Sequence, residues 1–201
     1  NTKILALGEV THGSSEIFKM KSRVVKYLIE ENGFDVFALE ACMPEAYRLN
    51  EYITNGKGNP KDLINKMHFW IWETEEMLAL INWMREYNSQ HGRKIKFTGI
   101  DMQYYDGALD EIEAICRTGD NFLIGKSLDS LKSHLQVYEM CRKNKEEQTS
   151  ESKVFFKEKW AELRNFAKNI VDSTSRNWFL QNVRILEQYS REYDGVYRDI
   201  C

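Results

Sequence analysis

The sequence DVFALEA, at residues 35–41, is the stretch that decides the fold. Its apolar run, Val36 to Leu39, is short and continuous, which is typical of a strand buried in a parallel sheet. Two similar runs are KILALG at 3–8 and IKFTGI at 95–100. The sequence therefore predicts three strands, near 3–8, 35–40 and 95–100.

Helical patterns connect these three runs. We expect helices over about 15–31, from Pro44 to about residue 53, and over about 73–90, with Gly33 and Gly92 following the first and third. The first helix carries an apolar stripe that should face the core: Ile17, Met20, Val24 and Leu28. Strands that alternate with helices through short connections are the pattern of right-handed crossover units in a parallel sheet.

The second half of the chain has a helical pattern almost throughout. Three amphipathic helices are expected, around 124–138, around 156–170 and from 179 onward, with a polar, charged break at 143–152. We therefore predict an α/β protein with two parts. Residues 1–104 form an α/β part that carries the active-site loops, and residues 105–201 form a helical elaboration of the same domain.

Composition and charge limit the classes of function. The 201 residues are 42% hydrophobic and 29% charged, with a formal net charge of -3, as in ordinary globular proteins. No basic stripe marks a nucleic-acid surface, and no apolar run of about 18 residues marks a membrane span. The four cysteines lack metal-ligand spacing, so we expect free thiols in a reducing compartment and a cytoplasmic protein.

Polar residues stand where each predicted strand stops. Glu9 and His12 follow the first strand, Glu40 ends the second, and Asp101 follows the third. Ligands of open parallel sheets bind beyond the carboxyl ends of the strands, so we expect these four side chains to cluster around a cleft. A carboxylate such as Glu40 after an apolar run is costly unless it is paired or functional. An alternative role for Asp101 is to cap the segment that follows it.

His12 is the candidate general base of this cluster. A histidine, with an ordinary pKa of about 6.5, takes up a proton near neutral pH, and a carboxylate such as Glu9 or Glu40 would orient its ring. Gly13 allows a tight turn beside it, and the amides that open the next helix favour a developing oxyanion. The spacing alone leaves open the alternative that His12 is a structural hydrogen-bonding residue.

His68 and Trp70 are candidates for substrate binding. They belong to the run HFWIW at 68–72, which follows a loop and would form one wall of a pocket; plain core packing is the alternative. The sequence has no GxSxG elbow, no glycine-rich dinucleotide motif, no P-loop and no HExxH. An ordinary serine hydrolase is therefore disfavoured.

At these residues the chain resembles the erythromycin esterase family. GEVTHGS at 8–14, Lys21 in the next helix and ALEA at 38–41 look like the opening of that family. FTGIDMQ at 97–103 resembles its third strand, and YRD at 197–199 resembles an Arg-Asp element that begins a further helix. Some members carry the label succinoglycan biosynthesis protein, which is a weaker guide to function.

The resemblance implies a three-layer α/β/α fold with a mainly parallel sheet and helical elaborations. It implies ester hydrolysis without a cofactor, with macrolide lactones as the substrates of characterised members and hence a link to antibiotic resistance. His12 would activate water, Glu9 and Glu40 would be active-site carboxylates, and Arg198 would lie near the same cleft. The family also has a histidine pair on a later strand, so the resemblance implies that this chain stops before part of the sheet and site.

Two other functions stay open beside an esterase that acts on a small-molecule ester. The first is a metal-dependent hydrolase in which Glu9, His12 and Glu40 hold a divalent metal. The second is an inactive relative that binds a ligand in the same pocket. None of the three involves nucleic acid or a membrane as a partner.

Overall fold

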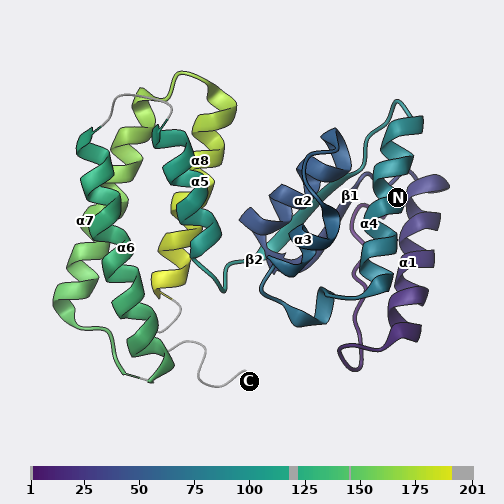
Figure 1. Cartoon of the computed structure of the whole chain (residues 1–201), viewed down its shortest axis with the longest axis horizontal. Coiled ribbons are helices and arrows are strands. Elements are labelled where there is room, and N and C mark those ends of the chain that lie inside the picture. The colour runs from purple at the N-terminus through teal and green to yellow at the C-terminus, as the bar shows by residue number, and fades with distance from the viewer. Residues whose placement is uncertain (1, 118–121, 145, 192–201) are drawn as a thin grey trace. The chain divides into compact units, whose positions relative to one another are not determined.

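The structure, a computed structural model, describes residues 2–117, 122–144 and 146–191 (Figure 1). Two compact units make up the chain, residues 1–101 and residues 102–201. The first unit contains α1 (Ser15–Glu30), β1 (Val36–Cys42), α2 (Met43–Asn55), α3 (Pro60–Asn65), the 3-10 helix η1 (Trp70–Trp72), α4 (Glu75–Gln90) and β2 (Lys96–Asp101). The second contains α5 (Asp106–Arg117), α6 (Phe122–Lys143), α7 (Ser150–Phe166), the 3-10 helix η2 (Ala167–Asn169) and α8 (Ser173–Arg191).

Strands β1 and β2 pair in parallel. Phe37 lies opposite Phe97, and Cys42 lies opposite Asp101, so the two strands end at the same edge. The strands predicted near 35–40 and 95–100 are therefore confirmed, as is the α/β class with a parallel sheet and a largely helical second half. Within the described residues the sheet has these two strands.

Within the described part of the first unit, one face of this sheet is covered. Leu39, Ala41 and Phe97 point into the core of the first unit and are buried. The alternate residues are exposed on the other face: Val36, Ala38, Glu40, Lys96 and Ile100. This alternation is the side-chain period of a half-buried sheet rather than of a strand covered on both faces.

The strand predicted at 3–8 is wrong. These residues have no regular secondary structure, and their side chains are exposed, with Ile4 at 87%. A strand needs a neighbouring strand to satisfy its backbone groups, and neither β1 nor β2 pairs with this segment. The apolar composition of a short run therefore did not suffice to make it a strand.

Helix α1 forms where it was predicted, but its buried stripe lies one residue further along. Phe18, Val25 and Ile29 are buried, whereas Met20, assigned to the core from the sequence, is 58% exposed. One residue corresponds to a rotation of about 100° around a helix. The packing of Phe18 against Trp72, edge to face with ring centroids 5.6 Å apart, favours this orientation.

A buried amide ties the second strand to the helices of the first unit. Asn88 in α4 donates to the carbonyl oxygens of Ile53 (3.3 Å) and Ile95 (2.9 Å), and its oxygen accepts from the Ile95 amide (2.7 Å). Three hydrogen bonds from one buried side chain thus join the end of α2, the last turns of α4 and the start of β2. They fix the strand whose other end reaches Asp101.

The second unit contains four described α-helices, one more than the sequence predicted. The helix that was missed is α5, whose buried residues include Ala108, Leu109 and Ile112. The three predicted helices are confirmed as α6, α7 and α8, and the polar break falls between α6 and α7. None of the described helices combines the length and apolarity that crossing a membrane requires.

Candidate active site

His12 and Glu9 are in direct contact in the loop before α1. The Nδ1 atom of His12 forms a short hydrogen bond with a carboxylate oxygen of Glu9, and the other Glu9 oxygen accepts from the Lys21 Nζ at 2.5 Å. The Glu9 side chain is 10% exposed, whereas that of His12 is 55% exposed. The carboxylate is thus shielded by the loop, and the imidazole faces solvent.

The surroundings of Glu9 keep it ionised. Burial alone would raise the pKa of the Glu9 carboxyl, but the hydrogen bonds from Lys21 and His12 and their positive charges outweigh burial, so this pKa lies below its ordinary value. An ionised carboxylate on Nδ1 fixes the ring and stabilises the imidazolium that forms when the other ring nitrogen takes up a proton. The pair has the chemistry of a general base and its orienting acid.

The loop that carries this pair turns at Gly13. Gly13 has φ of 79°, a left-handed conformation that favours glycine, and a Cβ at this position would lie 3.8 Å from the Trp70 ring. Just beyond it, the Ser15 hydroxyl donates to Glu76 at 2.5 Å, and this bond lowers the pKa of Glu76. The start of α1 is thereby anchored to the start of α4.

Trp72 links this loop to the end of β1. Its indole N–H donates to the main-chain oxygen of Glu40 at 2.9 Å, and its ring packs on Phe18. The Lys21 amine lies 5.9 Å from the centroid of the same Phe18 ring. A continuous series of contacts therefore runs from the Glu40 backbone through Trp72 and Phe18 to Lys21 and Glu9.

The Glu40 carboxylate lacks the contact with Glu9 or His12 that the predicted cluster implies. It lies on the exposed face of the sheet, and no hydrogen bond or ion pair among the described residues joins its carboxylate to Glu9 or His12. The physical reason is the two-residue period of a strand, because buried Leu39 and Ala41 turn the residue between them outward. Glu40 therefore approaches the site through its backbone.

Close packing fixes the course of β1 at Glu40. The pairing of β1 with β2 is regular up to Leu39 opposite Gly99 and is irregular between Leu39 and Cys42. A Cβ added to Gly99 would lie 2.2 Å from the Ala41 oxygen and 2.7 Å from the Cys42 oxygen. Only glycine fits between these backbone atoms, so Gly99 permits the irregular course of the Glu40 segment.

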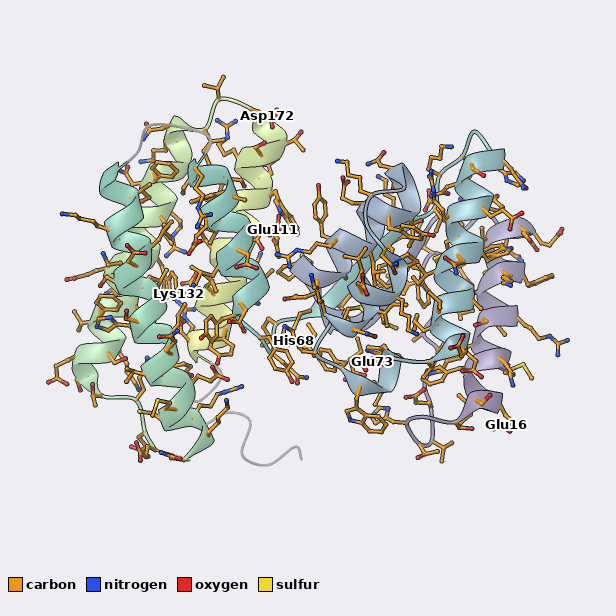
Figure 2. All side chains as sticks on the ribbon, in the orientation of Figure 1. Glu16, His68, Glu73, Glu111, Lys132 and Asp172 are labelled. Carbon is orange, nitrogen blue, oxygen red and sulfur yellow. The ribbon has the colours of Figure 1, made fainter. Side chains whose placement is uncertain are left out.

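The candidate substrate-binding residues have different surroundings. His68 and Glu73 flank the run at 69–72 (Figure 2). His68 has φ of 64°, and its Nε2 lies 3.9 Å from Glu45, a buried carboxylate in the first turn of α2. Trp70 is 71% exposed beside Gly13.

The other two candidates are Asp101 and Arg198. Asp101 ends β2 at the edge where β1 also ends and is half-buried. Arg198, with the rest of the YRD element, lies outside the described residues. Within residues 2–117, 122–144 and 146–191, no group of three or more His, Cys, Asp and Glu side chains could hold a metal ion.

Sequence reasoning gave no site role of its own to Lys21, Glu45 or Glu76. The signal for Lys21 was present, since it falls on the stripe of Phe18, Val25 and Ile29. A lysine on the inward face of a helix needs a partner carboxylate, which here is Glu9. Glu45 and Glu76 occupy the first turns of α2 and α4, where acidic residues are common for reasons of helix stability, so no signal distinguished them.

The class of protein is defined by parallel strands, a solvent-facing loop histidine paired with a carboxylate, and a sequence without a serine elbow: it is an α/β protein with a histidine–carboxylate pair. The family model for erythromycin esterase matches residues 29–199. The chain belongs to the erythromycin esterase family.

Two curated proteins show this similarity in sequence. The YbfO protein of Bacillus subtilis (strain 168), which carries a provisional hydrolase name, is 36% identical over 101 residues, or 50% of this chain and 22% of YbfO. Erythromycin esterase type II of Escherichia coli is 29% identical over 168 residues, which cover 75% of this chain and 39% of that protein.

Solved structures share the fold. A succinoglycan biosynthesis protein superposes with a TM-score of 0.71 at 30% identity, over 93% of this chain and 46% of that one. A mutant of the erythromycin esterase EreC in its open conformation has a TM-score of 0.69 at 20% identity, over 94% of this chain and 49% of that one. The chain thus spans less than half the length of each of these relatives.

Proposed function

We propose that this protein is a hydrolase that cleaves an ester by attack of water activated by His12. The observation that carries the proposal is the pairing of His12 Nδ1 with the ionised, shielded Glu9. Water adds to the ester carbonyl as His12 Nε2 takes up its proton, and the imidazolium returns that proton to the departing alcohol oxygen. Lys21 holds Glu9 in place, and no acyl-enzyme forms.

The substrate we propose to test first is a macrolide lactone. The erythromycin esterases among the relatives are named for one, and exposed Trp70 beside Gly13 supplies an apolar surface next to the loop that carries the base. We assign Asp101, His68 and Arg198 to substrate binding as well. Glu40 would act as a second carboxylate of the site, since Trp72 connects its backbone to the His12 loop.

The test is hydrolysis of erythromycin and of simple aryl esters, followed by mass spectrometry and absorbance. His12→Ala should lower the rate by about 10²–10⁴, because a positioned general base contributes that factor. The circular dichroism spectrum should stay unchanged, since His12 is exposed and adds little to the core. The matched control is His91→Ala, an exposed histidine at the end of α4, which should keep the full rate.

Two further measurements separate this mechanism from the metal-dependent one. Glu40→Gln tests the proposed second carboxylate and should slow hydrolysis, because the amide removes the negative charge at this position. Metal analysis accompanies each variant. Full activity in both His12→Ala and Glu40→Gln would refute water activation by His12, and joint loss of activity and a stoichiometric metal would replace it with metal-dependent hydrolysis.

A further inference from the structure

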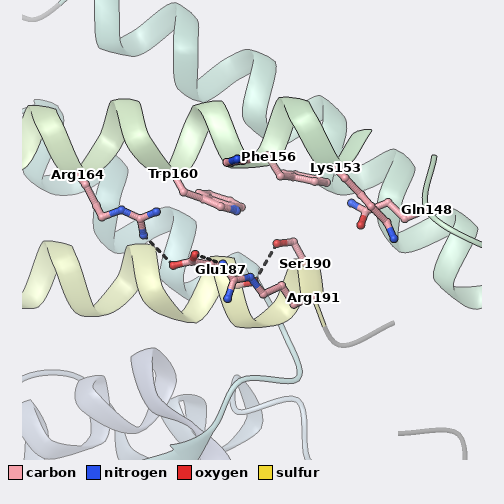
Figure 3. Close-up of a pocket in the computed structure, with 9 residues that line it drawn as sticks. Gln148, Lys153, Phe156, Trp160, Arg164, Glu187, Ser190 and Arg191 are labelled. Atoms are coloured by element: carbon pink, nitrogen blue, oxygen red, sulfur yellow. Dashed lines mark hydrogen bonds and ion pairs between the residues drawn. The ribbon is translucent and has the colours of Figure 1, made fainter. Parts of the chain in front are cut away.

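A pocket lies between α7 and α8 in the second unit (Figure 3). Its volume is ≈ 330 Å³, which falls at the lower end of the range for pockets that hold small molecules. The residues of the candidate active site take no part in it. The pocket therefore has its own set of lining residues.

The lining of this pocket is strongly basic. Four cations, Lys153, Lys157, Arg164 and Arg191, face one carboxylate, Glu187, so the local charge is 4 − 1 = +3. The whole chain carries a net charge of -3. A concentration of positive charge on an acidic protein, in a concave site, attracts anions and holds them more strongly than a flat surface does.

The two arginines are held in position before any ligand arrives. Glu187 accepts from Arg164 at 2.7 Å and from Arg191 at 2.5 Å, as the dashed lines in Figure 3 show. Each guanidinium has five N–H donors, and each of these bonds uses one. The remaining donors are therefore available in a fixed orientation, which lowers the entropic cost of binding an anion.

The floor of the pocket is aromatic. Phe156 and Trp160, one turn apart on α7, stack with ring centroids 5.6 Å apart and planes inclined by 8°. Both side chains are buried, so the floor is rigid and apolar. With Phe156 2% exposed and Trp160 3% exposed, the floor presents a small apolar area to a ligand, and the cations stand at the rim.

We propose that this pocket binds a small organic anion in which a carboxylate or phosphate is attached to a flat apolar body. The anionic group contacts Lys157 and the unused donors of Arg164 and Arg191. The apolar body lies over Phe156 and Trp160. Selectivity requires both the cationic rim and the aromatic floor of the pocket. The rim alone would accept any anion, and the floor alone would accept any apolar molecule.

The test uses the full chain labelled with ¹⁵N and four probes: benzoate, phenyl phosphate, neutral benzamide and inorganic phosphate. The chain has five tryptophans, and the chemical shift of each indole N–H signal reports on ligand binding near that side chain. Benzoate or phenyl phosphate should shift the Trp160 signal saturably and leave those of Trp70, Trp72 and Trp83 in place. Benzamide and inorganic phosphate should bind at least about tenfold more weakly. Tighter binding of phenyl phosphate or of benzoate identifies which anionic group the site prefers.

Substitution at the rim completes the test. Lys157→Gln should weaken binding of the tighter probe by about tenfold, since a hydrogen bond to a charged group is lost. Lys132→Gln, on the exposed side of α6 in the same unit, should bind as the wild type does. The proposal is overturned if the Trp160 signal does not move, if benzamide binds as tightly as benzoate, or if the two variants behave alike.

Discussion

Lys21 is the residue that joins the chemistry of the His12 loop to the packing of α1. Its amine lies on the inward stripe of the helix, near the Phe18 ring, and donates to Glu9. Burial of the Glu9 carboxylate would otherwise raise its pKa and favour the protonated acid, which cannot stabilise an imidazolium. The lysine thus secures the charge that orients His12.

Lys21→Met should raise the pKa of Glu9, as followed by ¹³C NMR titration of its carboxyl carbon. A carboxyl whose pKa is lowered in the folded state adds stability above the unfolded value of 4.5, and this stability is lost as the pH falls through the folded value. The variant should therefore lose less stability than the wild type between pH 7 and pH 3. Arg23→Gln, an exposed cation on the same helix, should titrate like the wild type.

At the scale of the elements, the β1–β2 pair depends on the space at Gly99. Gly99→Ala would drive a methyl group into the Ala41 and Cys42 carbonyls, and these backbone atoms can move only if the strands separate. We expect a loss of about 2–3 kcal/mol in the free energy of unfolding, measured with urea.

The matched control for Gly99→Ala is Gly92→Ala, where a Cβ would meet nothing within 4 Å. That variant should stay within about 0.5 kcal/mol of the wild type. Equal stability of the two variants would show that the strands tolerate the methyl group at Gly99.

The predicted strands that form are those whose apolar run has a partner strand. The strands at 36–42 and 96–101 combine apolar runs with a carboxylate at or near the end. The run at 3–8 has the same composition, and only the missing partner strand distinguishes it. Helix α5 was not assigned from the sequence, although its buried residues Ala108, Leu109, Ile112 and Cys116 recur at helical spacing.

Part of the candidate site could also be predicted from the sequence. Glu9 and His12 were both expected in a cluster beyond the strand ends, and the structure brings them into contact although the strand predicted before them does not form. The outward direction of Glu40 follows from the alternation of Leu39 and Ala41, which the apolar run concealed. The sequence could not show which face of α1 is buried, because the apolar stripes that start at Ile17 and at Phe18 both have helical spacing.

A tyrosine cluster makes the helices of the second unit sensitive to alkali. Burial, with the charges of Asp106 and Glu139, raises the pKa of Tyr105 to about 12, and burial also raises the pKa of Tyr189. The two rings lie 5.3 Å apart between α5 and α8. The unfolded chain therefore releases these phenolic protons first, and stability is lost as the pH rises above 10.

We expect the urea concentration at the midpoint of unfolding, followed by far-ultraviolet circular dichroism, to decrease as the pH is raised from 9.5 to about 12. Tyr105→Phe should flatten this dependence, because phenylalanine has no proton to lose. Tyr27→Phe, at an exposed position of α1, should follow the wild-type profile. A flat wild-type profile would contradict the prediction.

For the whole molecule, the order of folding should follow the separation of contacts along the chain. Helices α6, α7 and α8 are consecutive and each packs on the next, whereas Val36 pairs with Lys96, 96 − 36 = 60 residues later. Pairing residues that are far apart in sequence closes a long loop, and the chain loses this entropy before the strand contacts stabilise the folded state. In pulse-labelled hydrogen exchange, amides of α6 to α8 should gain protection before those of β1 and β2. Simultaneous protection would contradict this order.

The open face and outer edges of the sheet have a consequence for handling the protein. Each described strand pairs with another strand on one side only, next to exposed Val36 and Ile100, and on the outer edges side chains bond only some backbone groups, such as the Phe97 amide and the Glu40 carbonyl. Such edges recruit strands from other molecules. With a net charge of only -3, electrostatic repulsion between molecules is weak and vanishes in mildly acidic buffer. Concentrated stocks should therefore remain clear longest in mildly alkaline buffer of low ionic strength.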